Sequence, residues 1–170
     1  MNFDSIVTLG AGAFTLENGG IAGFNGIPVA DLTIGVNSNV VSGKTISVLT
    51  FSSTSTFIQG GSLPDGNYRL SILSNLITAS GLNLDGDNNG IAGGNHVKGA
   101  AEADAFFRFF GDTSGNRSTA PAELGQLRLS LNRSAPDPLY DARFDFNNNG
   151  TVAPAELGLL RQRLNRRMDF

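Results

Sequence analysis

Short runs of alternating apolar and polar residues fill the first part of the chain. Leu32–Val36 and Tyr68–Ile72 alternate at every second position, which is the period of a strand with one buried face. Three further runs between turn-forming Gly, Asn and Ser residues are strand candidates: Phe3–Leu9, Ala13–Glu17 and Thr45–Phe51. About seven short strands in about 100 residues predict an all-β sandwich over residues 1–99.

From Ala100 onward the apolar residues follow a helical spacing instead. Two leucine triplets at i, i+3 and i+7 each define one face of a helix: Leu124, Leu127 and Leu131, then Leu157, Leu160 and Leu164. We expect a further helix before these two, whose aromatic side chains complete the core or face the sandwich: Phe106, Phe107, Phe109 and Phe110. The pattern therefore predicts a multidomain chain, in which a small all-α domain over residues 100–170 follows the sandwich.

One segment of the second part occurs twice. Ala120–Asn132 recurs as Ala153–Asn165 at a constant offset of 33 residues, and only its seventh, tenth and eleventh residues change. Such self-similarity indicates a duplicated structural unit. A motif that precedes both copies at the same offset is therefore far less often accidental than a single match.

A loop with the spacing of a 12-residue calcium site lies upstream of each copy. In such a loop oxygen ligands stand at positions 1, 3, 5, 7 and 12. The two ligand sets are Asp112, Ser114, Asn116, the carbonyl of Ser118 and Glu123, and Asp145, Asn147, Asn149, the carbonyl of Thr151 and Glu156. Gly150 fills the sixth position, where φ must be positive, but the first loop has Arg117 there, at a cost of roughly 1–2 kcal/mol. The sequence predicts two Ca²⁺ sites, of which the second binds more tightly.

A third segment matches only the first half of such a loop. Asp85, Asp87 and Asn89 stand at alternate positions with Gly90 sixth, but the twelfth position is His96 and not Glu. A third Ca²⁺ ion there needs ligands from elsewhere in the chain. The alternative is a polar turn whose Asp and Asn residues tolerate positive φ.

Composition limits the classes of function. The formal net charge is -3 at pH 7, so nothing builds the basic surface that nucleic-acid binding requires. Cysteine is absent, which excludes disulfides and thiolate metal sites. No apolar stretch approaches the ~20 residues of a membrane span. No signal peptide is visible, and because the chain opens directly on a strand candidate we expect a fragment of a longer polypeptide.

The duplicated loop and helix over residues 103–167 resemble the dockerin family. The run Leu63–Leu70 also resembles the turn into a late strand of immunoglobulin-like sandwiches, where a tyrosine hydroxyl ties the corner down. The resemblance implies an immunoglobulin-like, X-module-like domain followed by a dockerin-like tandem of EF-hand type. It also implies a place at the C-terminal end of a larger exported bacterial protein, outside the cell or on its surface.

The same resemblance implies a protein partner, either cohesin-like or a surface-layer protein. The family's partner-contacting positions fall here on Pro121, Ala122, Arg128 and Arg133, and again on Pro154, Ala155, Arg161 and Arg166. Most of these residues agree between the copies, so one partner could dock in two orientations. The Pro-Ala pairs replace a polar pair that is common in the family, so either the partner differs or there is no cohesin.

Three other functions compete with a non-catalytic, calcium-binding interaction module as explanations of this sequence. An enzyme is disfavoured because His96 is the only histidine, no Gly-x-Ser-x-Gly elbow exists, and Gly10-Ala11-Gly12 lacks the third glycine of a dinucleotide site. A carbohydrate-binding accessory module of a polysaccharide-degrading enzyme usually presents exposed aromatic residues, yet Trp is absent and Tyr occurs twice. A calcium-stiffened cell-surface spacer without a cohesin partner stays open.

Overall fold

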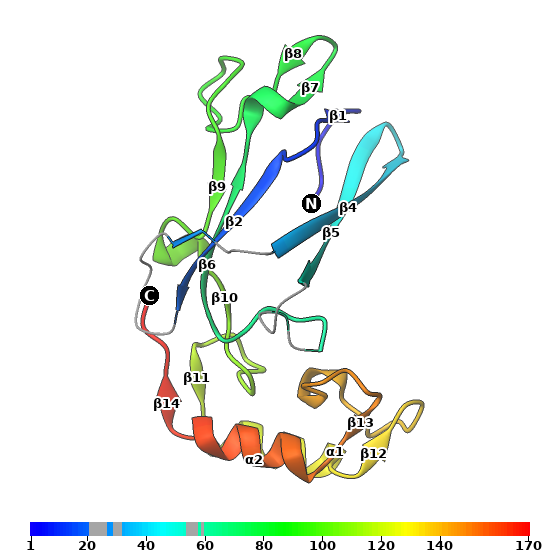
Figure 1. The fold of residues 1–170 in the computed structure, drawn as a ribbon, viewed down its shortest axis with the longest axis vertical. Helices are drawn as coiled ribbons and strands as arrows, with labels where there is room; N and C mark the ends of the chain where they lie inside the picture. Colours follow the sequence, from blue (N-terminus) through cyan, green and yellow to red (C-terminus); the bar gives the residue numbers. More distant parts are fainter. Residues whose placement is uncertain (21–26, 29–31, 54–57, 59) are drawn as a thin grey trace.

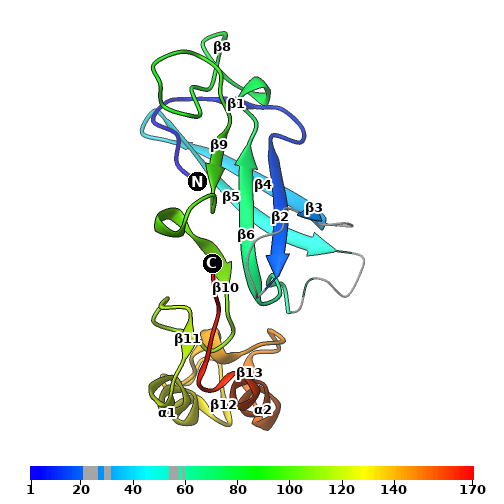
Figure 2. The same cartoon turned by 90° about the vertical axis from the view of Figure 1, so that its left-hand side faces the viewer.

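The protein has a β-rich end and an end that holds both α-helices (Figures 1 and 2). This computed structural model describes residues 1–20, 27–28, 32–53, 58 and 60–170. We call residues 1–108 the β region and residues 109–170 the helix module. Strand β10 (Phe106–Arg108) leads from the first into the second.

The largest sheet of the β region is built around β6 (Gly66–Ile72). This strand pairs antiparallel with β2 (Phe14–Gly20), β9 (His96–Lys98) and β10, and β3 (Ile27–Pro28) extends the sheet beyond β2. The alternation predicted for Tyr68–Ile72 is confirmed, because its three apolar side chains are buried and the two between them are half-buried.

Two smaller sheets complete the β region. Strands β4 (Leu32–Val41) and β5 (Lys44–Ser53) form a long hairpin. This confirms the strands that were predicted at Leu32–Val36 and Thr45–Phe51. The other sheet joins β1 (Thr8–Leu9), β7 (Ile77–Ala79) and β8 (Leu82–Asn83). Two 3₁₀ turns, η1 (Ser74–Leu76) and η2 (Glu102–Asp104), lie between these elements.

The core of the β region lies between the central sheet and the hairpin. Its buried members come mainly from β2 and β6: Phe3, Ala13, Phe14, Leu16, Leu63, Tyr68, Leu70, Ile72 and Ile77. Leu32, Ile34, Leu49 and Phe51 of the hairpin pack against this cluster. The Tyr68 hydroxyl donates to the carbonyl of Pro64 at 2.7 Å, so the expected corner contact forms.

The fold class expected from the sequence is nevertheless wrong. The strands of the described residues form five small sheets of two to five strands, without the two-sheet immunoglobulin-like sandwich that was predicted. The second part is not all-α either. The predicted helix over Phe106–Phe110 is absent, because β10 adds to the exposed edge of β6 in the register Phe107↔Asn67.

Two helices and two short ladders make up the helix module. The helices are α1 (Pro121–Ser130) and α2 (Pro154–Arg163), each with proline at its first position, where the missing N–H costs nothing. A 3₁₀ turn, η3 (Ala142–Phe144), precedes the second loop. The four strands are β11 (Ser118–Thr119), β12 (Arg133–Ser134), β13 (Thr151–Val152) and β14 (Arg166–Arg167).

These ladders join one copy of the repeat to the other. Strand β11 of the first loop pairs with β14, which follows α2, and β13 of the second loop pairs with β12, which follows α1. The registers Thr119↔Arg166 and Arg133↔Val152 are equivalent under the offset of 33 residues. The copies are therefore related by a pseudo-two-fold arrangement, in which α1 and α2 lie side by side (Figure 2).

The helix module has its own apolar core. Leu127 and Leu160, the middle leucines of the two predicted stripes, are fully buried, as are Phe144 and Val152. Phe110 joins them from the segment that links the two parts. The outer leucines of both stripes are only partly buried, and the third leucine of each stripe lies just beyond the end of its helix.

Neither helix of the described residues is long and apolar enough to cross a lipid bilayer.

Candidate metal centre

The Asp112 carboxylate organises the first loop from its first position. Its Oδ1 accepts the backbone N–H groups of Gly115 (2.8 Å) and Asn116 (3.1 Å), and its Oδ2 accepts that of Arg117 (2.8 Å). The side-chain oxygen of Asn116 accepts from the backbone N–H of Ser118 at 2.8 Å. These bonds close the loop into a ring with oxygen-bearing side chains at alternate positions.

The second loop repeats this arrangement. The carboxylate of Asp145 accepts the backbone N–H groups of Asn149 (3.1 Å) and Gly150 (2.7 Å). The side-chain oxygen of Asn149 accepts from the backbone N–H of Thr151 at 2.9 Å, and that of Asn147 accepts from Asn149 at 3.1 Å. The first and fifth positions therefore have the same hydrogen-bonding roles in both copies.

The backbone conformations of the two loops also agree. The fourth position has positive φ in both, at Gly115 (φ 74°) and Asn148 (φ 55°). The sixth position does too, at Arg117 (φ 66°) and Gly150 (φ 82°). The sequence prediction that Arg117 adopts the left-handed region is confirmed.

A buried glutamate closes each loop from the first turn of the following helix. Glu123 is 5% exposed and Glu156 is 1% exposed. In each case Oε2 accepts the backbone N–H of the N-cap residue, Ala120 or Ala153, at 3.1 Å. Within the described part of the chain, neither carboxylate has a cationic partner, and neither accepts a hydrogen bond at Oε1. A largely buried carboxylate without a cationic partner favours the binding of a cation.

The donor set suits a hard cation. Each loop offers two carboxylates together with amide, hydroxyl and backbone carbonyl oxygens, which are the ligands of Ca²⁺. Among the described residues, no three His, Cys, Asp or Glu side chains come together as a metal-binding group. Each loop contains only two carboxylates. The other oxygen atoms at its ligand positions belong to Ser, Asn, Thr and the backbone, so neither loop contains three such side chains.

The Tyr140 side chain lies next to the second loop, a role that the sequence analysis missed. Its hydroxyl donates to Oδ2 of Asp145 at 2.7 Å. This hydrogen bond, together with desolvation and the nearby negative charges, raises the pKa of Tyr140 above its usual value. The corresponding residue of the first copy, at the offset of 33 residues, is Phe107, which belongs to β10 and whose ring lies against Arg117. The only available sequence signal was the position of Tyr140 five residues before the second loop.

The Asp85 turn has the same local conformation as the two loops. The Asp85 carboxylate accepts the backbone N–H groups of Asn89 (3.1 Å) and Gly90 (2.8 Å), and Asn89 accepts that of Ile91 (2.8 Å). Although desolvation opposes it, these backbone donors hold the pKa of Asp85 below its usual value. At the twelfth position, the ring Nδ1 of His96 lies 3.1 Å from the carbonyl of Gly86, so no carboxylate closes this turn.

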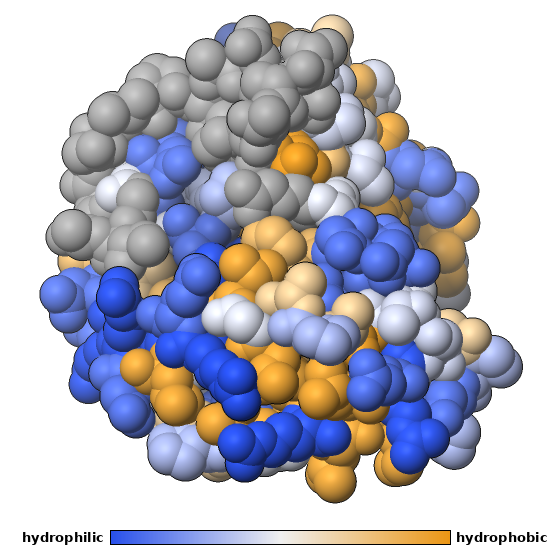
Figure 3. Space-filling view, turned by 60° about the horizontal axis from the view of Figure 1, so that its bottom comes forward, coloured by the Kyte–Doolittle hydropathy of each residue, from blue (hydrophilic) through white to orange (hydrophobic). Residues whose placement is uncertain are grey.

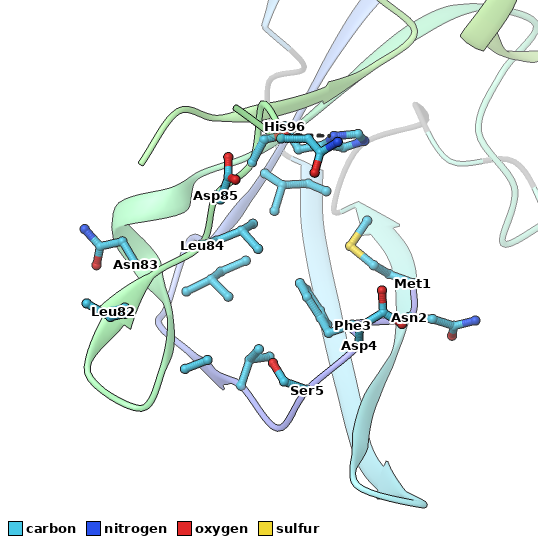
Figure 4. A pocket seen from close by; sticks show the side chains of 16 residues that line it. Met1, Asn2, Phe3, Asp4, Ser5, Leu82, Asn83, Leu84, Asp85 and His96 are labelled. Atoms are coloured by element: carbon cyan, nitrogen blue, oxygen red, sulfur yellow. Dashed lines mark hydrogen bonds between the residues drawn. The ribbon is translucent and has the colours of Figure 1, made fainter. Parts of the chain in front are cut away.

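A pocket of about 620 Å³ adjoins this turn. It lies between the first residues of the chain and the β7–β8 hairpin, and Figure 4 shows Phe3 and Leu84 on opposite sides of it. Asp85 and His96 stand at one end of the pocket. The lining is mixed, with apolar side chains such as Phe3 and Leu84 and polar ones such as Asp85 and His96.

The sequence-predicted partner residues lie on the surface of the helix module. All eight are exposed: Pro121, Ala122, Arg128, Arg133, Pro154, Ala155, Arg161 and Arg166. Of their arginines, Arg133 pairs with Asp137 at 3.2 Å. Figure 3 shows apolar side chains gathered on the face that carries the helices, with hydrophilic side chains around them. Leu129 and Leu139 are among the exposed large apolar residues, at 67% and 49% exposed.

Comparisons with protein-family models, with curated proteins and with solved structures give no match to this chain. The dockerin-like and X-module-like assignment is therefore wrong as a statement of family. The physical reason lies in the elements before the loops. A helix-loop-helix tandem needs a helix on each side of the ion loop, but β10 and the three-residue η3 stand where the entering helices were expected. The duplicated unit is a loop, a helix and a strand.

Proposed function

We propose that the helix module binds two Ca²⁺ ions, one in each duplicated loop, and serves as a non-catalytic, calcium-stabilised interaction module. The observation that carries this proposal is the buried glutamate at the twelfth position of both loops. Glu123 and Glu156 are held at helix starts with one carboxylate oxygen free of hydrogen bonds among the described residues. An ion held between this oxygen and the ring of Asp and Asn ligands satisfies the buried charge.

The ring conformation supports the same conclusion. In each loop the aspartate collects backbone N–H groups and thereby fixes the loop before any ion arrives. A preformed ring loses little conformational entropy on binding, which favours affinity. The proposed ligands are Asp112, Ser114, Asn116, the Ser118 carbonyl and Glu123 in the first loop, and Asp145, Asn147, Asn149, the Thr151 carbonyl and Glu156 in the second.

Calcium also fits the size of the module. A unit of 62 residues (109–170) without cysteine has a small apolar core, and a structural metal is one of the usual means of stabilising such a unit. Two carboxylates per loop favour the low affinities of extracellular modules, about 10⁻⁴–10⁻³ M. We therefore propose a location outside the cell or on its surface, where calcium reaches such concentrations.

The stoichiometry we propose is two ions and not three. Asp85, Asp87 and Asn89 reproduce the first half of a loop, but His96 stands in place of the closing glutamate. Without that ligand the turn holds fewer oxygens than Ca²⁺ requires. A third equivalent of bound calcium that is lost in Asp85→Asn protein would contradict this count.

Calcium titration calorimetry on chelator-stripped protein tests the proposal. We expect two equivalents of bound ion, and a melting temperature that rises with calcium because the ion binds only the folded loops. Glu123→Gln with Glu156→Gln should abolish both effects. The matched control is Glu102→Gln, which changes an exposed glutamate outside the loops. No binding heat and an unchanged melting curve at about 10 mM calcium, well above the affinities of extracellular modules, would contradict the proposal.

The exposed arginines support an interaction role. Arg128 and Arg161 are equivalent under the repeat, and so are Arg133 and Arg166, and all four are exposed. Arginine is enriched at interface hot spots. The second candidate function is a calcium-stiffened spacer, which is favoured by the direct hydrogen bonds between the module and the β region, from Phe110 and Arg163 to Asp65 and from Arg117 to Asn67. Calcium-dependent binding to other exported proteins of the source cell, lost when all four arginines become alanine, separates the two.

A further inference from the structure

Arg117 extends from the first ion loop into the β region. Its side chain is almost completely buried, at 7% exposed. Nη1 donates to the side-chain oxygen of Asn67 at 2.7 Å and to the carbonyl of Asp169 at 3.2 Å. The guanidinium carbon lies 4.4 Å from the centre of the Phe107 ring and 5.3 Å from that of Phe170. Two strands of the β region and the C-terminal segment therefore surround one side chain of the loop.

The receiving residues are themselves fixed. Asn67 is 2% exposed, lies on β6 opposite Phe107 of β10, and donates from Nδ2 to the carbonyl of Asp169 at 2.7 Å. Asn67 thus bonds to Arg117 and to the C-terminal segment at once. A side chain with both its oxygen and its nitrogen engaged has no alternative orientation that keeps both bonds.

The second copy lacks this connection. Gly150 stands at the equivalent position with φ 82°, and a Cβ added to it would meet no atom within 4 Å. The second loop therefore adopts its ring conformation with the residue best suited to positive φ. The first loop holds an arginine at φ 66°, a conformation that costs roughly 1–2 kcal/mol for a residue other than glycine.

The ligand positions of the first loop lie on either side of this strained residue. Asn116 precedes Arg117 and Ser118 follows it, so both proposed ligands depend on the backbone angle at Arg117. If the side chain were free, only the backbone hydrogen bonds of Arg117, to Asp112 and from Met168, would offset the cost of the positive φ before the ion arrives. Because the β region holds the guanidinium in place, folding supplies that cost before the ion arrives.

We propose that the β region is the positioning partner of the first ion site: Asn67 and the two phenylalanine rings hold Arg117, and Arg117 holds the loop in its ion-binding conformation. This inference rests on the proposed function, since it concerns the affinity of the same loop. Coupling between two sites is reciprocal, so calcium in the first loop also stabilises the contact between the helix module and the β region. The second loop has glycine at this position and therefore lacks the arginine contact, although its backbone at Phe146 and Asn147 lies close to Gly60 of the β region.

A double-mutant cycle on the full chain tests this inference. Glu156→Gln removes the closing ligand of the second loop, so that calorimetry with Ca²⁺ in this background reports the first loop. We expect Asn67→Ala to weaken calcium binding by about five- to tenfold when Arg117 is present. In Arg117→Gly protein, Asn67→Ala should change the affinity by less than about twofold, because the cycle isolates the pair. The matched control, Asn39→Ala on the exposed hairpin, should leave the affinity unchanged.

The outcomes separate this inference from the proposed function. If calcium binds but Asn67→Ala has the same effect with and without Arg117, the coupling through Arg117 is refuted while calcium binding stands. If Glu156→Gln protein binds no calcium at all although the wild-type chain does, the first loop is no ion site and the inference fails with it. Should Asn67→Ala not fold, Phe170→Ala replaces it, since this ring lies at 39% exposed on the outer side of the guanidinium. Its expected effect is a weakening of about two- to threefold that again requires Arg117, as for a partly exposed cation–π contact.

Discussion

Asn132 and Asn165 occupy the same place in the two copies of the repeat, and each reaches across to the other copy. Asn132 has φ 59° and donates its backbone N–H to the carbonyl of Val152 at 2.7 Å. Asn165 has φ 60° and donates to the carbonyl of Thr119, also at 2.7 Å. Each asparagine turns the chain from the end of a helix into a ladder with the other loop.

We expect both asparagines to tolerate glycine but not alanine. Glycine adopts positive φ freely, whereas alanine there costs roughly 1–2 kcal/mol. Asn132→Ala and Asn165→Ala should therefore lower the free energy of unfolding by similar amounts, and the Asn→Gly variants should lie within about 0.5 kcal/mol of wild type. Urea unfolding measures all four. Asn37→Ala on the exposed hairpin is the control, and unequal effects at the two positions would show that the copies are not equivalent in energy.

The two ion loops should differ in affinity. The second loop has Gly150 at its sixth position and Asn147 at its third, whereas the first has Arg117 and the poorer ligand Ser114, whose hydroxyl already donates to Asp112 at 3.2 Å. Glu156→Gln should therefore remove the tighter phase of a calcium titration, and Glu123→Gln the weaker one. Calorimetry of the two single variants decides the order. The reverse assignment would mean that the contact with the β region more than offsets the advantage of glycine.

Removal of the Asp65 carboxylate should be severely destabilising. Asp65 is 6% exposed at its side chain and accepts from Arg108 (2.8 Å), from the Phe110 backbone N–H (2.8 Å) and from Arg163 of α2. Asp65→Ala leaves two half-buried guanidinium groups without their counter-charge, which costs about 3–5 kcal/mol. Asp137→Ala, which breaks an exposed pair with Arg133, should cost at most about 1 kcal/mol. Denaturant unfolding of the two variants compares them directly, and similar losses would show that the Asp65 cluster stabilises little.

Alkaline pH should unfold the protein together with the ionisation of Tyr68. Burial raises the pKa of this hydroxyl well above its usual value, against an opposite effect of Arg108. The unfolded chain releases this proton near pH 10, so the contribution to stability is complete below that pH and is lost as the pH rises towards the folded-state pKa. Tyrosinate absorbance and circular dichroism, followed together, should change in one step for Tyr68. Ionisation of both tyrosines near pH 10 in folded protein would contradict this expectation.

Local patterns predicted the elements of this protein better than its architecture. The strands at Leu32–Val36 and Tyr68–Ile72 and the two helices after the loops follow from spacing and turn residues, and they form as expected. The prediction of a helix over Phe106–Phe110 is wrong, because these apolar residues suit the buried face of a strand as well as that of a helix. A short apolar run does not distinguish a strand from a helix. Here the run forms strand β10, because it pairs with the edge of β6.

The sequence also predicted the positions of the two loops and the positive φ at Arg117. This was possible because the same twelve-residue spacing occurs in both copies of the repeat. What surrounds Arg117 was not readable. Asn67 lies 50 residues away in the chain, and no periodicity connects it to the loop. The resemblance to a known family was wrong for a related reason, since its specific motifs were the loops and helices, whereas the segments before them form β10 and η3 in place of the expected helices.

The exchange of strands between the two copies has a consequence for how such a module could arise. Each half, taken as a loop, a helix and the strand after it, leaves both of its short ladders unpaired and needs a second half to complete them. Two identical copies of such a half could supply one another with these strands just as the two copies do within one chain. The present arrangement is that of a symmetric homodimer whose protomers have been fused end to end, and the segment Ala135–Asp141 serves as the bridge between them.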